Sequence, residues 1–401
     1  MAIDNKEKEV LNVPHLRFPE FSGEWYSYPL TDFMSFKNGM NPDAKRFGHG
    51  TKFISVMDIL NNQFIRYDNI RASVEVIAGD IETYGVNYGD ILFQRSSETL
   101  EDVGQANVYL DSKPAVFGGF VIRGKSKGNY HPMFFRYLLA SPTARKRIIV
   151  KGAGAQHFNI GQDGLSKVYL DIPSIQEQEK IAKLLECIDD RIATQNKIIE
   201  DLNKLKSAII EMEYTHKTKG NTHIGDFIEQ TSKRNKDSAI QNVLSVSNSQ
   251  GFIQQCEQFE NRSVASDDIS NYKIVERNCF AFNPARINVG SIARLTTFNR
   301  GIVSPMYICF RTKDNLFPEY LDYYFESKQF FTEIQKRLEG SVRQCLSFEG
   351  LCNIPLCIPT IEVQQQVGKQ LSTLVQEIKL EIDFLELLQR QKKFLLHQMF
   401  I

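Results

Sequence analysis

One segment of this sequence occurs twice, and this repeat constrains the fold more than any other feature. The chain reads LDIPSIQEQEKIAKLLECIDDRI from Leu170 and LCIPTIEVQQQVGKQLSTLVQEI from Leu356, an offset of 186 residues. Self-similarity at a fixed offset indicates one structural unit that is used twice. Further identical pairs at this offset are Pro132 and Pro318, Tyr137 and Tyr323, Ser141 and Ser327, Gly154 and Gly340, Gln178 and Gln364, and Lys206 and Lys392.

The block before each repeated segment is predicted to mix short strands with helices. The runs KFISVMDI, GDILFQRS, AVFGGFVI and KVYLDIP are rich in β-branched and aromatic residues and read as strands. HPMFFRYLLASPTARKRII and FPEYLDYYFESKQFFTEIQKRL read as helical stretches that begin near a proline. Upstream the register drifts, but FISV (53–56) resembles VLSV (243–246), and LTDF (30–33) resembles IGDF (224–227). The order predicts an α+β protein in which one mixed α/β fold is used twice.

The segment after each block is predicted to be one long helix. At ~1.5 Å per residue, a helix of about 38 residues is ~57 Å long. Apolar residues recur at spacings of three and four, which favours a coiled-coil seam where the two helices pack on each other. The alternative is that each helix only covers its own block. The predicted seam consists of Ile181, Leu184, Ile188, Ile198, Leu202, Leu205, Ile209 and Met212, and of Val367, Leu371, Leu374, Ile378, Ile382, Leu385, Leu388, Leu395 and Met399.

These patterns divide the chain into four parts and bound its chemistry. The predicted parts are 1–172 (first block), 173–217 (first helix), 218–358 (second block) and 359–401 (second helix). Because 48 basic residues balance 48 acidic ones, a polyanion site must be a local patch. The seven cysteines form no Cys-x-x-Cys pair, so we expect reduced thiols in a cytoplasmic protein. The start is too charged for a signal peptide, and no apolar run approaches the ~20 residues of a membrane span.

No set of residues in the sequence predicts catalysis or metal binding. There is no Walker lysine loop, no Gly-x-Gly-x-x-Gly after a strand and no His-Glu-x-x-His. NPAR (283–286) only partly resembles the Asn-Pro-Pro-aromatic motif of amino-methyltransferases, because it lacks the aromatic residue that stacks on a flipped base. Cys345, Cys352 and Cys357 lack the spacing of zinc ligands. We therefore expect a binding and assembly protein with no cofactor in this chain, and a self-sufficient enzyme is the least favoured class.

Two polar loops in each block are predicted to contact DNA. Arginine and lysine suit phosphates, whereas the amides of Gln and Asn can pair with adenine. The loops of the two blocks have similar flanking residues but different polar residues at their tips. We expect this of two domains that recognise different DNA sequences. The alternative for each residue is a solvated loop side chain. The candidates are Arg95, Ser96, Ser97, Arg145, Lys146, Arg147, Lys151, Gln156, His157 and Asn159, and in the second block Asn283, Arg286, Asn288, Lys336, Arg337, Arg343 and Gln344.

Essentially the whole chain resembles the specificity (S) subunit of Type I restriction–modification systems, the HsdS family. The resemblance rests on VPHLRFPEFSGEW near the start, on IPSIQEQEKIAKLL and IPTIEVQQQVGKQL, and on the GDILFQRS loop. It implies that each block is a target recognition domain that reads one half of a bipartite DNA sequence. It also implies that a long antiparallel two-helix coiled coil separates the two similar domains in a pseudo-twofold molecule.

The same resemblance implies partners and assigns the chemistry to them. Two modification subunits, which carry S-adenosylmethionine and the methyltransferase site, would dock on the helical regions. Restriction subunits, which use ATP and Mg and cut DNA, would join through the modification complex. Double-stranded DNA would be the ligand, with no membrane involved. The alternative function is a non-DNA adaptor with two repeated binding modules on a coiled coil.

Overall fold

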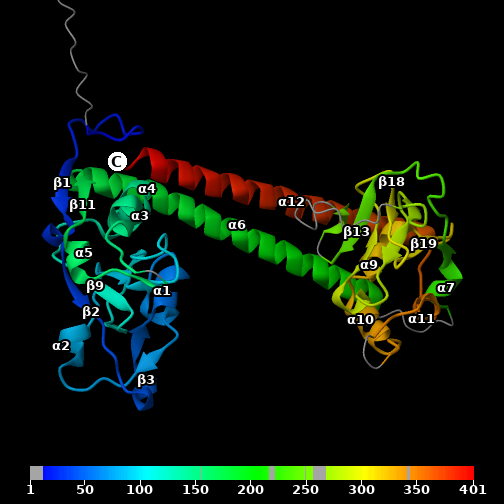
Figure 1. The fold of residues 1–401 in the computed structure, drawn as a ribbon, viewed down its shortest axis with the longest axis horizontal. Helices are drawn as coiled ribbons and strands as arrows, with labels where there is room; N and C mark the ends of the chain where they lie inside the picture. Colours follow the sequence, from blue (N-terminus) through cyan, green and yellow to red (C-terminus); the bar gives the residue numbers. More distant parts are fainter. Residues whose placement is uncertain (1–11, 155, 216–221, 249, 256–267, 341–343) are drawn as a thin grey trace, which may run out of the picture. The chain divides into compact units, whose positions relative to one another are not determined.

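The computed structural model describes residues 12–154, 156–215, 222–248, 250–255, 268–340 and 344–401. The chain forms two compact units. Unit 1 comprises Met1–Asn196 with Asp383–Ile401, and unit 2 comprises Lys197–Ile382 (Figure 1). Both long helices, α6 (Ile175–Thr215) and α12 (Ile361–Gln398), therefore contribute residues to both units.

Unit 1 contains two small sheets, two short ribbons and five short α-helices within its described residues. Its elements are β1 (Tyr26–Pro29), β2 (Met34–Asn38), β3 (Phe47–Ile54), α1 (Val56–Leu60), β4 (Ser73–Val74), α2 (Asp80–Tyr84), β5 (Ile91–Gln94), β6 (Ser96–Ser97), β7 (Ala106–Val108), β8 (Val116–Phe117), β9 (Val121–Ser126), α3 (Pro132–Ala140), α4 (Pro142–Ile149), β10 (Phe158–Asn159), α5 (Gln162–Ser166) and β11 (Tyr169–Ile172). The larger sheet is antiparallel with the order β2–β9–β5–β7, and the smaller has the order β4–β3–β8. A buried cluster joins Phe93 of the larger sheet to Phe134 of α3 and Leu185 of α6.

Unit 2 contains two four-stranded sheets within its described residues. Its elements are α7 (Ile224–Phe227), β12 (Ile228–Thr231), β13 (Val243–Ser247), β14 (Gly251–Gln254), β15 (Lys273–Glu276), β16 (Phe280–Phe282), β17 (Ile292–Arg294), β18 (Arg300–Val303), β19 (Ile308–Thr312), α9 (Pro318–Tyr324), α10 (Lys328–Gln335) and α11 (Phe348–Cys352). The sheet orders are β12–β19–β16–β17 and β14–β13–β18–β15. Phe310 of β19, Tyr320 of α9 and Leu371 of α12 belong to one buried cluster.

The strand pairings confirm that one fold is used twice. The order β12–β19–β16–β17 in unit 2 repeats the order β2–β9–β5–β7 in unit 1. Both units also contain one parallel pair, in which Phe53 lies opposite Val116 and Val243 lies opposite Ile302. These pairs fall in FISV and VLSV, so the repeat holds where the sequence register drifts. The predicted α+β class is therefore confirmed.

Each predicted helical stretch is in fact two helices, divided at a serine. Ser141 caps α4, because its Oγ accepts from the main-chain N of Ala144 at 3.3 Å. Ser327 caps α10 in the same way, with Phe330 N at 3.1 Å from its Oγ. Serine favours the cap over the helix interior, since its hydroxyl satisfies an otherwise unpaired N–H group. The predicted stretches are thus helical on both sides of these two serines.

A buried glutamine fastens the start of each long helix to its block. Gln178 donates from Nε2 to the carbonyl oxygen of the proline five residues earlier, at 3.0 Å. Its Oε1 accepts from the main-chain N of His131, also at 3.0 Å. Gln364 makes the same two contacts, at 2.9 Å to its own proline and at 2.8 Å from Phe317 N. The identical Gln pair in the sequence therefore marks one repeated structural contact.

The ends of the long helices pack on equivalent tyrosines. In unit 1 the Lys392 ammonium of α12 lies 5.7 Å from the ring centroid of Tyr137. In unit 2 the Lys206 ammonium of α6 lies 5.9 Å from the ring centroid of Tyr323. Each unit thus holds the start of one long helix and the end of the other, as an antiparallel pair requires. The alternative, in which each helix covers only its own block, was wrong.

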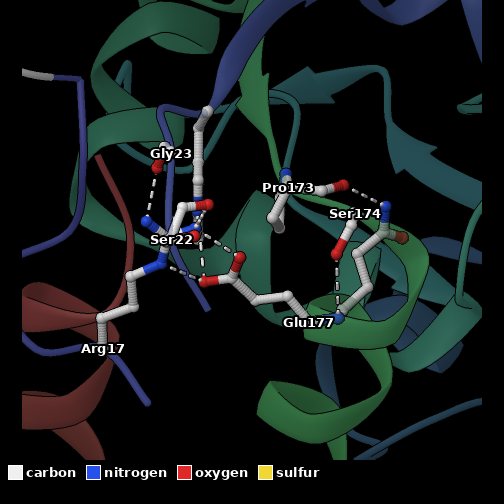
Figure 2. A network of polar contacts seen from close by, with 8 residues as sticks. Arg17, Ser22, Gly23, Pro173, Ser174 and Glu177 are labelled. Carbon is white, nitrogen blue, oxygen red and sulfur yellow. Dashed lines mark hydrogen bonds and ion pairs between the residues drawn. The ribbon is translucent and has the colours of Figure 1, made fainter. Parts of the chain in front are cut away.

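The opening motif VPHLRFPEFSGEW anchors unit 1 at the start of α6. Arg17 forms a bidentate pair with the buried carboxylate of Glu177, with Nε–Oε1 and Nη2–Oε2 distances of 2.8 Å. The guanidinium also donates to the carbonyl oxygen of Gly23, and Ser174 Oγ accepts from Glu177 N at 3.4 Å (Figure 2). Trp25 is buried and donates from Nε1 to the same carboxylate at 3.3 Å.

The buried stripe of α6 differs from the predicted seam. Ile181, Ile188, Leu202 and Ile209 lie on it as predicted, but Leu205 is 50 % exposed. The stripe instead passes through polar positions, because long polar side chains can fill a helix interface with their aliphatic stems. Gln195 is buried at a seam position, where it was predicted as a polar interruption. Exposed members of the predicted seam are Ile198, Leu205, Met212 and Ile382; unpredicted members of the two stripes are Leu185, Ile192, Ile199, Lys206 and Lys392.

Candidate nucleic-acid interface

In unit 1 the two loops that were predicted separately form one surface. β6 pairs with β10, so Ser96 lies opposite Asn159 and Ser97 lies opposite Phe158. Ser96 Oγ donates to Asn159 Oδ1 at 2.5 Å, and Ile160 N donates to the carbonyl oxygen of Arg95 at 2.9 Å. The exposed side chains of this surface come from Gln156, His157 and Asn159, with Ser96 and Ser97 half-buried beside them.

Unit 2 joins its two loops in the same way. Leu346 N donates to the carbonyl oxygen of Pro284 at 3.0 Å, which repeats the contact between Ile160 and Arg95. Arg95 and Pro284 are equivalent because each lies two residues after a paired phenylalanine, Phe93 of β5 and Phe282 of β16. Glu339 and Cys345 form a bridge with main-chain distances of 2.9 and 2.8 Å, as Ala153 and Asn159 do in unit 1. The strand frame therefore brings both loops of each unit together, while their side chains differ.

Two of the candidate arginines in unit 1 contact the protein itself. The Arg145 guanidinium donates to the carbonyl oxygens of Glu101 and Val103 at 2.8 and 2.7 Å, and burial lowers its pKa. Arg147 pairs with Asp171 at 2.7 Å and donates to a main-chain carbonyl at 3.0 Å. Both contacts hold loops and strands in place. The basic candidates with exposed side chains in unit 1 are Lys146 and Lys151.

The Arg95 side chain braces a neighbouring turn. Its Nη1 donates to the carbonyl oxygen of Gly119 at 3.2 Å, and its main-chain N donates to the carbonyl oxygen of Phe120 at 2.9 Å. Arg95 is half-buried at the end of β5. It therefore links the turn at 118–120 to the loop that carries Ser96 and Ser97.

The candidates in unit 2 divide between structural and accessible side chains. Asn283 is buried, and its Oδ1 accepts from Ala285 N at 3.1 Å, as a turn-forming residue does. Lys336 and Arg337 both pair with Glu333 of α10, at 2.6 and 2.5 Å. Arg286 and Gln344 are exposed, and Asn288 is half-buried. Arg343 lies outside the described residues.

A basic surface pocket in unit 2 was missed. Lys233, Arg234, Lys236 and Arg300 line a hollow of about 850 Å³, and among the described residues that line it Asp237 is the only acidic one. Its loop is held by the buried Asn235, whose amide exchanges two hydrogen bonds with Ile240, at 3.1 and 2.9 Å. The sequence SKRNK at 232–236 indicates a basic loop. It does not show that Arg300 lies beside this loop, because Arg300 is brought there by the pairing of β15 with β18.

Among the described residues, no group of three or more His, Cys, Asp or Glu side chains could hold a metal ion. Of the helices that the structure describes, none is both long and apolar enough to cross a membrane.

The structure contains two copies of one mixed α/β block. Each copy has a joined pair of polar loops and packs on parts of both long helices. This arrangement defines a two-module recognition protein. Comparison with known proteins agrees with this class. Residues 22–204 match the model of the Type I restriction modification DNA specificity domain. By sequence, the chain is therefore similar to Type I restriction–modification specificity subunits.

Two curated proteins from Methanocaldococcus jannaschii are similar in sequence. The putative type I restriction enzyme MjaX specificity subunit is 27 % identical over 225 residues, which cover 52 % of this chain and 51 % of that protein. The type I restriction enzyme MjaVIII specificity subunit is 25 % identical over 238 residues, which cover 56 % and 50 %. The chain thus matches about half the length of these relatives.

Two solved structures share the fold. The S subunit of a Type I restriction–modification system from M. genitalium gives a TM-score of 0.58 at 15 % identity, covering 97 % of this chain and 99 % of that one. A chain from a study of the assembly and conformational transition of the type I R-M system gives 0.54 at 12 % identity, covering 93 % and 96 %.

Proposed function

We propose that this chain is the non-catalytic DNA-recognition subunit of a Type I restriction–modification complex. Each unit reads one half of a bipartite duplex target through its joined loops. The observation that carries the proposal is the repeated contact between Ile160 and Arg95 in unit 1 and between Leu346 and Pro284 in unit 2. One frame thereby presents two different sets of polar side chains, as two different half-sites require.

The accessible side chains of each surface suit the groups of a DNA duplex. Gln156 and Asn159 in unit 1, and Gln344 in unit 2, carry amides that can pair with adenine. Lys151 and Arg286 are exposed cations beside them and suit phosphates or guanine. Arg145 and Arg147 support the loops and are not assigned a DNA contact. Arg95 and Asn283 likewise hold turns of the loops, and the other candidate residues keep their predicted role.

The basic pocket of unit 2 supplies the local patch that a chain of zero net charge needs for a polyanion. We assign the phosphate backbone beside the second half-site to Lys233, Arg234, Lys236 and Arg300. Because the whole chain has no net positive charge, we expect it to bind DNA weakly by itself and more tightly once assembled. A salt titration with and without the modification subunit tests this, and equal affinity and slope would refute it.

We assign the long helices to protein partners, with two modification subunits docked on them. Phe384, Leu387 and Phe394 of α12 are 47 %, 59 % and 58 % exposed, and their spacing of three and seven places them on one face of the helix. Exposed apolar side chains that gather on one face suit a protein interface. In this assignment the modification subunits bring S-adenosylmethionine, restriction subunits bring ATP and Mg, and the complex works on DNA in the cytoplasm. The domain boundaries 1–172, 173–217, 218–358 and 359–401 belong to the same proposal.

The decisive experiment is methylation-sensitive sequencing of DNA from cells that express this chain with its modification partner. We expect one methylated bipartite motif with a fixed spacer, absent when either protein is omitted. Purified chain with labelled methyl donor and DNA should transfer no methyl group. Partner binding without any methylated motif and without DNA affinity would instead establish the adaptor function.

A further inference from the structure

Each unit presents one large apolar side chain at the tip of a turn beside its joined loops. Phe120 in unit 1 is 69 % exposed, and Met306 in unit 2 is 59 % exposed. The two residues are related by the offset of 186 residues, although they differ in type. Phe120 lies between β8 and β9, and Met306 lies between the equivalent strands β18 and β19.

The main chain of this turn is the same in both units although its residues have changed. Val121 N donates to the carbonyl oxygen of Gly118 at 2.9 Å, and Tyr307 N donates to that of Ser304 at 3.1 Å. The first turn reads Gly-Gly-Phe and the second Ser-Pro-Met. A single exposed apolar residue is common on protein surfaces. Here an exposed apolar residue occurs at the same tip in both repeats, although the other turn residues are replaced. This repetition indicates that the exposed side chain has a function.

The turn is continuous with the candidate DNA interface. In unit 1 it is bonded to Arg95, which precedes Ser96 and Ser97, through both the main chain and the guanidinium. Phe120 also lines an apolar surface hollow of about 440 Å³ together with Phe47 and Met57. This places an apolar surface directly beside the polar loop.

In unit 2 the register of the sheet gives the same placement. Phe282 of β16 lies opposite Ile308 of β19, so Asn283, which opens the candidate loop, follows at the end where Met306 precedes β19. The loop is closed by Asn283 N donating to the carbonyl oxygen of Ser291 at 3.0 Å.

We propose that Phe120 and Met306 are base-contacting residues, one for each half-site, and that each packs against the C5-methyl group of a thymine. The inference rests on the proposed function and deepens it. The thymine methyl is the apolar feature of the major-groove edge, and apolar side chains read it by contact. The flanking amides and hydroxyls can hydrogen-bond to base edges but cannot distinguish a methyl group by that means.

The first test is methylation mapping of cells that express Phe120→Ala or Met306→Ala with the modification partner. We expect Phe120→Ala to relax one A·T position in one half-site and Met306→Ala to relax one in the other, with the spacer unchanged. The controls Tyr88→Ala in unit 1 and Phe331→Ala in unit 2 remove equally exposed rings, at 63 % and 54 %, and should leave the motif intact.

The second test measures affinity of the assembled complex for duplexes in which that thymine is replaced by uracil. Loss of one methyl contact should weaken wild-type binding about fourfold. Phe120→Ala should bind both duplexes equally, and Phe120→Leu should keep part of the discrimination.

Three results would overturn the inference. They are an unchanged motif and affinity in both alanine variants, a relaxed position that is not an A·T pair, and equal weakening on every sequence. A wild-type complex that methylates no bipartite motif would overturn the proposed function itself, and the inference with it.

Discussion

The repeated glutamine shows what one residue does in this fold. Gln178 and Gln364 are almost fully buried, and each satisfies at least two main-chain groups where a long helix begins. The sequence showed that the two residues are equivalent but not which groups they contact. The type of a residue determines which groups its side chain can bond to. The group that it actually contacts depends on which part of the chain folds beside it. For the same reason the sequence did not show the protein partners of Arg145 and Arg147, which were predicted to contact DNA. Arg145 donates to protein carbonyls, and Arg147 pairs with Asp171.

Replacing Gln364 by alanine should destabilise unit 2. The substitution leaves the partly buried main-chain N of Phe317 without its acceptor, which costs about 1 kcal/mol. Thermal and urea unfolding should show the loss. Gln366→Ala on an exposed position of the same helix is the control and should stay within about 0.5 kcal/mol of wild type. Equal stability of the two variants would show that the hydrogen bonds of Gln364 contribute nothing to the stability of unit 2.

Replacing Arg17 by alanine should destabilise unit 1 more strongly. The Glu177 side chain is only 2 % exposed, and the substitution removes its bidentate partner. Breaking one side of a buried ion pair typically costs about 3–5 kcal/mol. Lys180→Ala, which removes the exposed pair with Glu20, should change stability by less than about 1 kcal/mol. Calorimetry of the full chain would separate the two effects, and similar melting of both variants would contradict the expectation.

At the scale of elements, the sequence predicted kinds of structure better than their limits. Both long helices and the repeated blocks were foreseen, because periodic apolar spacing and a fixed offset survive residue changes. KFISVMDI was predicted as one strand, yet β3 ends at Ile54 and α1 begins at Val56. Ser55 caps that helix, and Asp58 accepts from its main-chain N at 2.7 Å. A local capping contact therefore overrode the β-branched composition.

The basic pocket belongs to the same scale, because strand pairing assembles it from distant segments. Lys233→Ala combined with Arg300→Ala should weaken DNA binding of the assembled complex on all sequences alike. If each cation neutralises one phosphate, the slope of log affinity against log salt should fall by about two. Arg311→Ala with Lys328→Ala removes the same charge elsewhere on unit 2 and is the control. A slope equal to that of this control would contradict the assignment.

At the scale of the whole molecule, the repeat and the helices define what the chain can do. Each unit holds the start of one long helix and the end of the other, so a change of length in one helix alone disturbs both units. The loops differ between the units, while the frame that carries them does not. Under the proposed function, replacing residues 220–355 by the equivalent part of a Type I restriction–modification specificity subunit should therefore change only one half of the target. The identity of the bases was beyond prediction, since side chains such as Gln156 and Gln344 can serve more than one base edge.

If the long helices set the spacing of the half-sites, lengthening both should lengthen the spacer. Seven residues inserted at equivalent points of α6 and α12 add one heptad, which keeps the buried stripes in register. The added length is about 10 Å, or about three base pairs of duplex. Methylation mapping should then show both half-sites unchanged and the spacer longer, whereas insertion into α6 alone should abolish methylation. Altered half-sites at the original spacing would show that the helices do not measure the DNA.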